Sequence, residues 1–470
     1  MSLLPTRDRM PRALLAGNTT IATRENRLAP AREGPQPQAP GHAPARGRRL
    51  AWLDALRGIA ALCVVYAHFG TRVLPQVHRA VYNVFDPGLY GVLVFFLVSG
   101  YIVPASLERK GSIRNFWISR LFRLFPLFVV AIAAVLLLHQ FGLASVRDTN
   151  RNVTASVLSH LFMLNELLGE TNIIVVLWTL SYEMVFYVLL TALFTAGLHK
   201  RSGWYAAGFA AAALLLGGLL PTVWLSYSSL GLTPVAVTGD VLIIGGLAAA
   251  VAARGRPRAA GAWLAAATVL ILVAVNGRKG SYEGLTILAL MFTGTLLYRA
   301  EQGQISRRRA VAVATGIFTA AIMAGAWHIP AASPQSQAAL PQREWVMSVA
   351  LAGLTFAVGM ALRNLTVPSI LAWLGLVSYS LYLLHPLLLD LYDSMPLARG
   401  HHSAGVQVAL TVGFLVVLLA CCALTYYLVE APMQRLGRRV AARLDARLGP
   451  DRLDASLRPG RLVAAGSPAS

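Results

Sequence analysis

An arginine and a histidine stand eleven positions apart in the otherwise apolar stretch RGIAALCVVYAH, which runs from Arg57 to His68. On an α-helix this spacing places both side chains on nearly the same face, about 16 Å apart along the axis. Arginine binds phosphate oxygens in pairs, and histidine is the commonest general base. The pair predicts a cation near one end of a helix face and an imidazole near the other. A simpler interpretation also stands, in which Arg57 anchors the helix beside Asp54 and His68 bonds a carbonyl.

A second pair of arginines opens another apolar run, RLFRLFP, where Arg120 and Arg123 are three residues apart. Helical residues at this spacing are neighbours on one face. Two guanidinium groups side by side form a suitable clamp for a phosphate. The alternative is that both residues only hold the helix end at a membrane surface.

A carboxylate lies well inside the apolar run LWTLSYEMVFYVLL, as Glu183. Burying such a charge in a membrane costs several kcal/mol unless it is paired or lines a wet cavity, so Glu183 is a candidate functional residue. Trp178 precedes it by five positions, although aromatic residues in such segments usually serve packing.

Hydroxyl and imidazole groups gather in two further apolar runs. FFLVSGYIV holds Ser99 and Tyr101 around Gly100, a composition that also favours close helix packing. LGLVSYSLYLLHP predicts a helix that is polar on one side and locally broken near Pro386. Its polar residues are Ser378, Tyr379, Tyr382 and His385. We interpret Glu430, near the end of the last apolar run, as a residue explained by helix termination and ion pairing.

The elements that position these residues must be membrane helices. Of the 470 residues, 56% are hydrophobic and only 13% are charged, which is far from the composition of a soluble domain. At about 20 apolar residues per span we expect an all-α polytopic bundle of about 10–12 transmembrane helices. The candidate spans are 51–70, 88–106, 119–141, 172–197, 204–226, 235–253, 260–276, 282–299, 308–328, 344–362, 370–393 and 405–429.

The positive charges predict the orientation of this bundle. With the N-terminus in the cytoplasm, 33 of the 41 Lys and Arg residues fall on the cytoplasmic side and 8 on the other. This bias predicts cytoplasmic termini and an inner-membrane type of location. The net charge of +21 is therefore explained by the orientation of the helices in the membrane, and no nucleic-acid partner is expected.

Three regions follow from the distribution of apolar residues. Residues 1–50 are predicted to be a disordered, basic, Pro/Ala-rich extension, residues 51–435 the transmembrane domain, and residues 436–470 a basic cytoplasmic tail. The tail begins as a basic helix on the inner leaflet, or else is a solvated tail without a role. Residues 142–171 are amphipathic and are expected to lie at the interface or to fold back into the membrane.

Several chemistries leave no signature in the chain. It has no GxSxG, GxxxxGK[ST], HExxH or GxGxxG motif, and its three cysteines lack metal-ligand spacing. We therefore expect no metal, and we expect the cysteines to be small packing residues.

Read in order, these motifs resemble the acyltransferase 3 family of membrane O-acyltransferases. The resemblance covers about residues 50–435 and includes MFTGTLLYRA at 291–300. The family's Arg-x10-His pattern falls on Arg57 and His68, and its arginine pair on Arg120 and Arg123. Its Trp-to-Glu pattern falls on Trp178 and Glu183, and its SY-x-x-YL-x-H pattern on Ser378, Tyr379, Tyr382 and His385. Such enzymes move acyl groups, commonly acetyl from acyl-CoA, onto hydroxyls of sugars or other exported molecules.

The resemblance implies a division of roles. His68, Arg57 and Glu183 would be catalytic, and Arg120 and Arg123 would hold the phosphates of acyl-CoA, with Ser99 and Tyr101 also contacting it. Trp178, Ser378, Tyr379, Tyr382 and His385 would support the site or the substrate. His68 would act as general base or carry the acyl group itself, and both routes stay open.

The acceptor and the class of protein have alternatives. A surface polysaccharide, a lipopolysaccharide sugar, a lipid-linked glycan or a small secreted metabolite would each suit as acceptor. A proton-coupled transporter could also use buried Arg, His and Glu residues, although paired broken helices in inverted repeats are not evident. A receptor or scaffold is the third alternative.

Overall fold

The computed structural model describes residues 51–146, 153–329, 341–395, 403–449 and 451. The predictions for residues 1–50 and for most of the tail after 448 lie outside these ranges. Within them the chain is helical and contains no strand, which confirms the all-α prediction. All described residues belong to one unit, residues 46–470.

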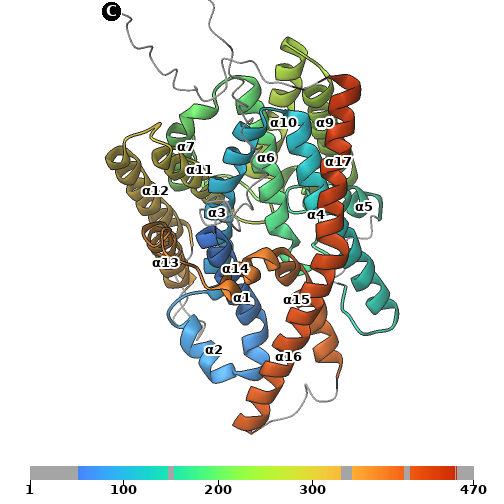
Figure 1. Cartoon of the computed structure of the whole chain (residues 1–470), viewed down its shortest axis with the longest axis vertical. Helices are drawn as coiled ribbons and strands as arrows, with labels where there is room; N and C mark the ends of the chain where they lie inside the picture. Colours follow the sequence, from blue (N-terminus) through green and yellow to red (C-terminus); the bar gives the residue numbers. More distant parts are fainter. Residues whose placement is uncertain (1–50, 147–152, 330–340, 396–402, 450, 452–470) are drawn as a thin grey trace, which may run out of the picture. The chain divides into compact units, whose positions relative to one another are not determined.

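The helices shown in Figure 1 alternate in direction along most of the chain. They are α1 (Ala51–Val73), α2 (Pro75–Tyr82), α3 (Pro87–Lys110), α4 (Ile113–Gln140), α5 (Val153–Leu161), η1 (Val175–Leu177), α6 (Trp178–Thr195), η2 (His199–Arg201), α7 (Ser202–Leu216), α8 (Trp224–Tyr227), α9 (Leu232–Ala252), α10 (Arg256–Val275), α11 (Ser281–Glu301), α12 (Arg307–His328), α13 (Pro341–Ala361), α14 (Ser369–Leu376), α15 (Ser378–Ser394), α16 (Ala404–Thr425), η4 (Tyr426–Glu430) and α17 (Ala431–Leu448).

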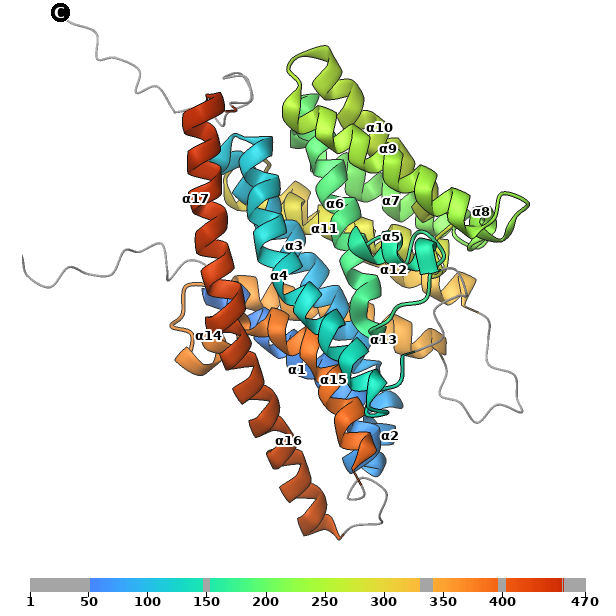
Figure 2. The same ribbon diagram turned by 90° about the vertical axis from the view of Figure 1, so that its right-hand side faces the viewer.

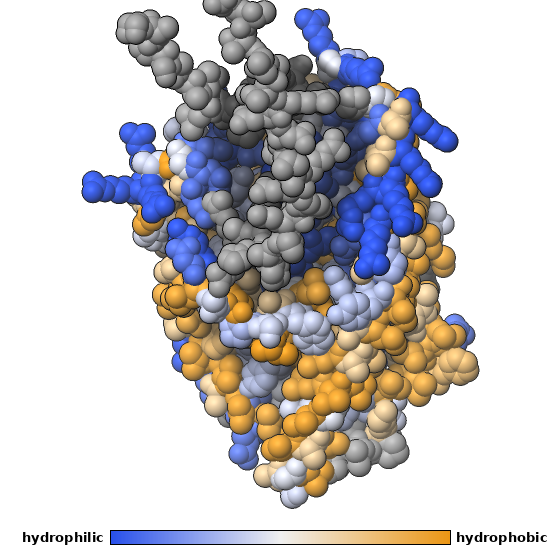
Figure 3. All heavy atoms as spheres, viewed as in Figure 1, coloured by the Kyte–Doolittle hydropathy of each residue, from blue (hydrophilic) through white to orange (hydrophobic). Residues whose placement is uncertain are grey.

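Nine helices among the described residues are long and apolar enough to cross a membrane, and the bent pair α14–α15 makes a tenth. The protein is therefore an integral membrane protein. Figure 3 shows hydrophilic residues gathered around the end of the bundle where α17 finishes, with hydrophobic residues dominating the surface beyond it. We call this hydrophilic end the basic end; exposed cations there include Arg109, Lys110, Arg254, Arg256 and Arg438.

Two of the twelve expected spans do not meet these criteria, α7 and α11. The span predicted over 204–226 was too long, because α7 ends at Leu216. The following GGLLP sequence, with two glycines and Pro221, does not continue a helix. α11 matches its predicted range but is nearly enclosed by other helices, with most of its residues buried.

The centre of the bundle depends on close approach between α3 and α11. A Cβ atom at Gly100 would lie 1.9 Å from the Met291 carbonyl oxygen, and one at Gly294 would lie 2.3 Å from the Leu97 oxygen. Only glycine permits this backbone contact, so the packing interpretation of Gly100 is confirmed. On the other side of α3, Gly91 approaches the Ala60 carbonyl of α1 in the same way.

The helix pair α14–α15 is bent by 68° at a break beside Val377. We predicted a break near Pro386, and this was wrong, because Pro386 lies inside α15, which continues through it. A tight contact fixes the actual break: a Cβ atom at Gly375 would lie 2.0 Å from the Asp54 carbonyl oxygen of α1.

The helices α16 and α17 form one long rod joined by a π-helical turn, η4 (Figure 2). α17 packs along α4, where Gly437 faces the Phe122 ring and Arg114 forms an ion pair with Asp445 at 2.5 Å. The predicted domain boundary at 435/436 falls inside α17. Residues 431–448 are thus a helix that continues the last span.

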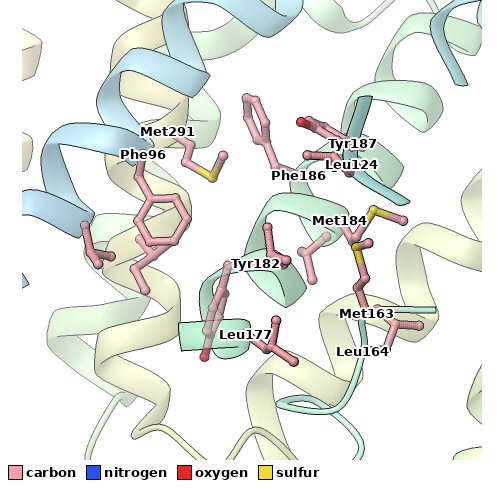
Figure 4. Packing of buried hydrophobic residues seen from close by; sticks show 14 of the residues in the cluster. Phe96, Leu124, Met163, Leu164, Leu177, Tyr182, Met184, Phe186, Tyr187 and Met291 are labelled. Atoms are coloured by element: carbon pink, nitrogen blue, oxygen red, sulfur yellow. The ribbon is translucent and has the colours of Figure 1, made fainter. Parts of the chain in front are cut away.

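The segment after α5 folds back into the protein. Asn165 and Glu166 are almost completely buried, and the Asn276 amide bonds the Leu167 carbonyl at 2.9 Å. Figure 4 shows Met163 and Leu164 packed near Met184 of α6.

The Glu166 carboxylate accepts a hydrogen bond from the Lys279 backbone amide at 2.7 Å. Burial raises the pKa of Glu166 to about 6, and hydrogen bonds and nearby cations oppose this rise.

Candidate active site

The three arginines singled out in the sequence line one cavity of about 90 Å³. We call it the arginine cavity. Arg57 comes from α1, and Arg120 and Arg123 come from α4. Its wall also includes Ser99, Glu183, Ser378, Tyr379 and Tyr382. The sequence predictions for these eight residues therefore converge on one place.

Arg120 is held in position by the protein itself. Its guanidinium is 5.6 Å from the centres of the Phe116 and Tyr187 rings and donates to Ser106 Oγ at 3.3 Å. A cation over aromatic faces keeps its charge while losing water. Arg57 forms a long ion pair with Asp54, at 3.9 Å, so the expected partnership exists but leaves the guanidinium on the cavity wall.

Glu183 lines the arginine cavity. His68 lines a different cavity, which Glu183 does not line. Glu183 Oε1 accepts hydrogen bonds from Tyr187 at 2.5 Å and from Ser99 at 3.1 Å. This geometry suits a fixed anion that balances the arginines.

His68 lines a second and larger cavity of about 370 Å³, which we call the histidine cavity. Trp178, Lys279 and Glu283 are on its wall, together with Tyr82, Asp86, Glu344 and Trp345. Lys279 Nζ is 4.5 Å from the Trp178 ring centre and 3.2 Å from Glu283 Oε1. Aromatic rings beside charged and hydroxyl groups are suited to a polar organic ligand.

Val92 and Tyr382 line both cavities. The Tyr382 hydroxyl is 2.8 Å from Thr179 Oγ1 and donates to the Val176 carbonyl at 3.2 Å. These bonds tie α15 to the start of α6 where the cavities adjoin. A long ligand passing from one cavity to the other would cross this place.

His68 faces a second histidine across α1 and α15. His385 Nε2 is 3.4 Å from His68 Nδ1, and the ring centres are 5.1 Å apart. His68 Nδ1 is 2.9 Å from the Val64 carbonyl oxygen, and His385 Nδ1 is 3.1 Å from the Leu381 oxygen. Because a carbonyl only accepts, both Nδ1 atoms carry the hydrogen, and the His68 lone pair resides on Nε2.

The remaining predicted residues divide between the site and its frame. Ser378 Oγ donates to the Gly375 carbonyl and Tyr379 Oη to the Leu124 carbonyl, both at 2.8 Å, so their hydroxyls brace α15. Tyr101 lies in an aromatic cluster with Trp52, Tyr298 and Phe356 and lines neither cavity. Its position does not fit the donor contact that we predicted.

Sequence reasoning missed Lys279 and Glu283, which belong to a loop and a helix start without a recognisable motif. The sequence feature that could have indicated them is the cluster of charged residues RKGSYEG, where one predicted span ends and the next begins. The prediction for Glu430 concerned only the helix end and did not include a contact with another helix. Glu430 is 3% exposed and accepts a 2.5 Å hydrogen bond from Ser380 Oγ, so it is a buried link between η4 and α15.

Metal-ligating side chains do not cluster in the part of the chain that the structure describes. No group of three or more His, Cys, Asp or Glu residues there could hold an ion.

The fold and the paired cavities define a class: a polytopic membrane protein with a site buried between its helices. The chain belongs to the acyltransferase 3 family, because the family model described as an acyltransferase domain matches residues 50–427. This membership favours an acyltransferase over the transporter and the receptor.

Three relatives illustrate the range of the family. The chain is 32% identical over 183 residues to acyltransferase MdmB of Streptomyces mycarofaciens, covering 36% of this chain and 46% of the relative. It is 24% identical over 171 residues to the putative peptidoglycan O-acetyltransferase YrhL of Bacillus subtilis (strain 168), covering 32% and 25%. It is 32% identical over 125 residues to Nodulation protein 10 of Rhizobium leguminosarum bv. viciae, covering 22% and 32%. Less than half of each relative's length is thus matched. No solved structure matches the chain.

Proposed function

We propose that the protein transfers an acyl group, acetyl in the simplest case, from acyl-CoA to a hydroxyl of a cell-envelope carbohydrate or another exported molecule. One observation carries this proposal: a cavity with three arginines adjoins a cavity with His68 at Val92 and Tyr382. An anionic donor and a hydroxyl acceptor can then meet without sharing one pocket.

The donor's phosphates bind Arg120 and Arg123, with Arg57 as a third cation. Guanidinium groups pair with phosphate oxygens, and Glu183 keeps the empty cavity from carrying an unbalanced positive charge. The pantetheine arm runs along α1 past Val92 and Tyr382. The offset of about 16 Å between Arg57 and His68 suits such an extended arm.

The transfer step uses the lone pair on His68 Nε2. It takes the proton of the acceptor hydroxyl as that oxygen attacks the thioester carbonyl. The C–S bond then breaks, the protonated His68 returns the proton to the thiolate, and an O-acyl ester and free CoA leave. In the covalent variant, His68 Nε2 attacks the thioester carbonyl and CoA leaves as the thiolate. The acceptor hydroxyl then attacks the acyl-imidazolium, its proton passes to the thiolate, and neutral His68 is restored.

The acceptor occupies the histidine cavity. Trp178 and Tyr82 offer aromatic faces, and Asp86, Lys279 and Glu344 offer polar groups, as a sugar ring requires. The name of YrhL, a putative peptidoglycan O-acetyltransferase, supports an envelope glycan as acceptor. The basic end is cytoplasmic in this proposal, as are both termini, and the histidine cavity opens towards the other side.

The acceptor class is tested by comparing envelope glycans from cells with the wild-type chain, without it, and with His68→Ala. Alkali-labile acetate in each purified glycan fraction is the measured quantity. We expect one fraction to lose its acetate both without the chain and in His68→Ala cells. Equal acetate in all fractions from all three strains would contradict the proposal.

A further inference from the structure

We propose that His385 is a positioning residue, which holds His68 in the tautomer and orientation that transfer requires. The inference rests on the proposed role of His68. It begins with the contact between His385 Nε2 and His68 Nδ1, at 3.4 Å, between residues 317 positions apart in the chain. α1 and α15 bring the two rings together, tilted by 56° to each other.

The hydrogen bonds give this contact a direction. The Leu381 carbonyl holds the hydrogen of His385 on Nδ1, so the lone pair of His385 is on Nε2, the atom facing His68. The Nδ1–H of His68 is thereby shared between the Val64 carbonyl and His385. Both partners keep that hydrogen on Nδ1 and leave the basic lone pair on Nε2.

His385 cannot take part in the reaction directly. Its side chain is 0% exposed, and it lines neither the arginine cavity nor the histidine cavity. A donor or acceptor bound in these cavities therefore meets His68 and not His385. This separates a positioning residue from a second base.

The choice of a histidine here has a physical reason. When His68 Nε2 takes the acceptor proton, the ring becomes a cation whose Nδ1–H points at the lone pair of His385. A hydrogen bond from a charged donor is stronger than one from a neutral donor, so the contact supports the cationic intermediate. An aspartate would do the same, but an anion buried inside a membrane protein is costly before the reaction begins.

The experiment compares His385→Gln with His385→Leu. The Gln carbonyl can accept from His68 Nδ1–H, whereas Leu only fills space. We expect His385→Leu to lower kcat for CoA release from acetyl-CoA about 10–100-fold, as for other partners that orient a functional histidine, without changing KM for acetyl-CoA. His385→Gln should recover most of the loss. His199→Gln, a buried histidine stacked on Phe194 away from both cavities, serves as the control with unchanged kcat.

A second readout does not depend on turnover. Carbethoxylation of His68 by diethyl pyrocarbonate, followed by peptide mass spectrometry, reports the reactivity of its Nε2. We expect slower modification in His385→Leu and near-normal modification in His385→Gln, with both proteins folded.

Two results would overturn the inference: unchanged His68 reactivity and kcat in folded His385→Leu, or equal impairment of both variants in proportion to their loss of thermal stability. If the wild-type protein releases no CoA while His385→Leu still slows modification, the proposed function fails and the positioning contact stands.

Discussion

At the scale of single residues, the proposed transfer separates two tasks that one pocket would perform poorly. In this proposal three guanidinium groups bind the anionic donor, and a neutral imidazole must stay basic. Placing both at one point would disfavour protonation of the imidazole, since like charges repel strongly in a low dielectric. On α1 the two functions are eleven residues apart, and each is braced by separate neighbours, Glu183 and Asp54 near the arginines and His385 beside His68.

The arginine pair predicts a change in donor binding more than in chemistry. We expect Arg120→Gln with Arg123→Gln to raise KM for acetyl-CoA by more than tenfold, because each charge-assisted hydrogen bond contributes about 1.5–3 kcal/mol. The kcat value should fall much less, as His68 is untouched. Steady-state kinetics of CoA release checks this, with the exposed Arg309→Gln as the matched control. A lower kcat at constant KM would assign the arginines another role.

At the scale of elements, glycines determine how near the cavity-lining helices approach. α3 carries Ser99 on the cavity wall, and its contact with α11 leaves no space for a side chain at Gly100. The bend at Val377 then directs α15, so that Tyr379 contacts α4, Tyr382 contacts α6 and His385 contacts α1. The site is thus a product of helix spacing and one bend.

Gly100→Ala is expected to destabilise the protein, because its Cβ would meet the Met291 carbonyl and force α3 and α11 apart. Overpacking of this kind costs about 1–3 kcal/mol. Gly245→Ala is the matched control: it also replaces a helical glycine, but no atom lies within 4 Å of the new Cβ, so stability should be kept or slightly raised. Thermal unfolding in detergent measures both, and equal stability of the two variants would refute the role of this contact.

The fold-back segment after α5 predicts a pH dependence. Burial raises the pKa of Glu166 from its usual 4.5 to about 6, so the folded state binds the proton more tightly than the unfolded state. The contribution of Glu166 to the free energy of unfolding is therefore greatest below pH 4.5. It falls by about 2 kcal/mol as the pH rises to about 6. Glu166→Gln removes this titration while keeping an acceptor for the Lys279 amide. Unfolding temperatures of the two proteins should diverge across that window, and parallel curves would contradict the assignment.

At the scale of the whole molecule, one helical bundle encloses two cavities that share Val92 and Tyr382. The protein also ties its basic end together with buried charges. Arg299 on α11 pairs with Glu108 of α3 at 2.7 Å and donates to the His199 carbonyl at 2.8 Å. Asp451, beyond the end of α17, accepts hydrogen bonds from the Arg258 guanidinium and from the Arg114 backbone amide. These contacts join α11 to α3 and η2, and α4 to α10.

Much of this organisation could be predicted from the sequence because it depends on local pattern. Apolar runs located most of the helices, although the span predicted over 204–226 ran ten residues past the end of α7, and helical periodicity placed Arg57 and His68 on one face. Other features depend on contacts between distant segments. No local pattern links His68 to His385, or Lys279 to Trp178, and Pro386 misled us about the bend because Gly375 determines it through a contact with α1.

The central claim is that acyl-CoA gives its acyl group to a hydroxyl acceptor at His68. The most direct test uses purified protein in nanodiscs, radiolabelled acetyl-CoA and the envelope-glycan fraction, and counts label in alkali-labile ester. The wild-type protein and His139→Gln, a histidine at the end of α4 away from both cavities, should transfer label equally. His68→Ala should remain folded and lose activity by about 10²–10⁴-fold, the usual contribution of a general base. Near-normal transfer by folded His68→Ala would contradict the account.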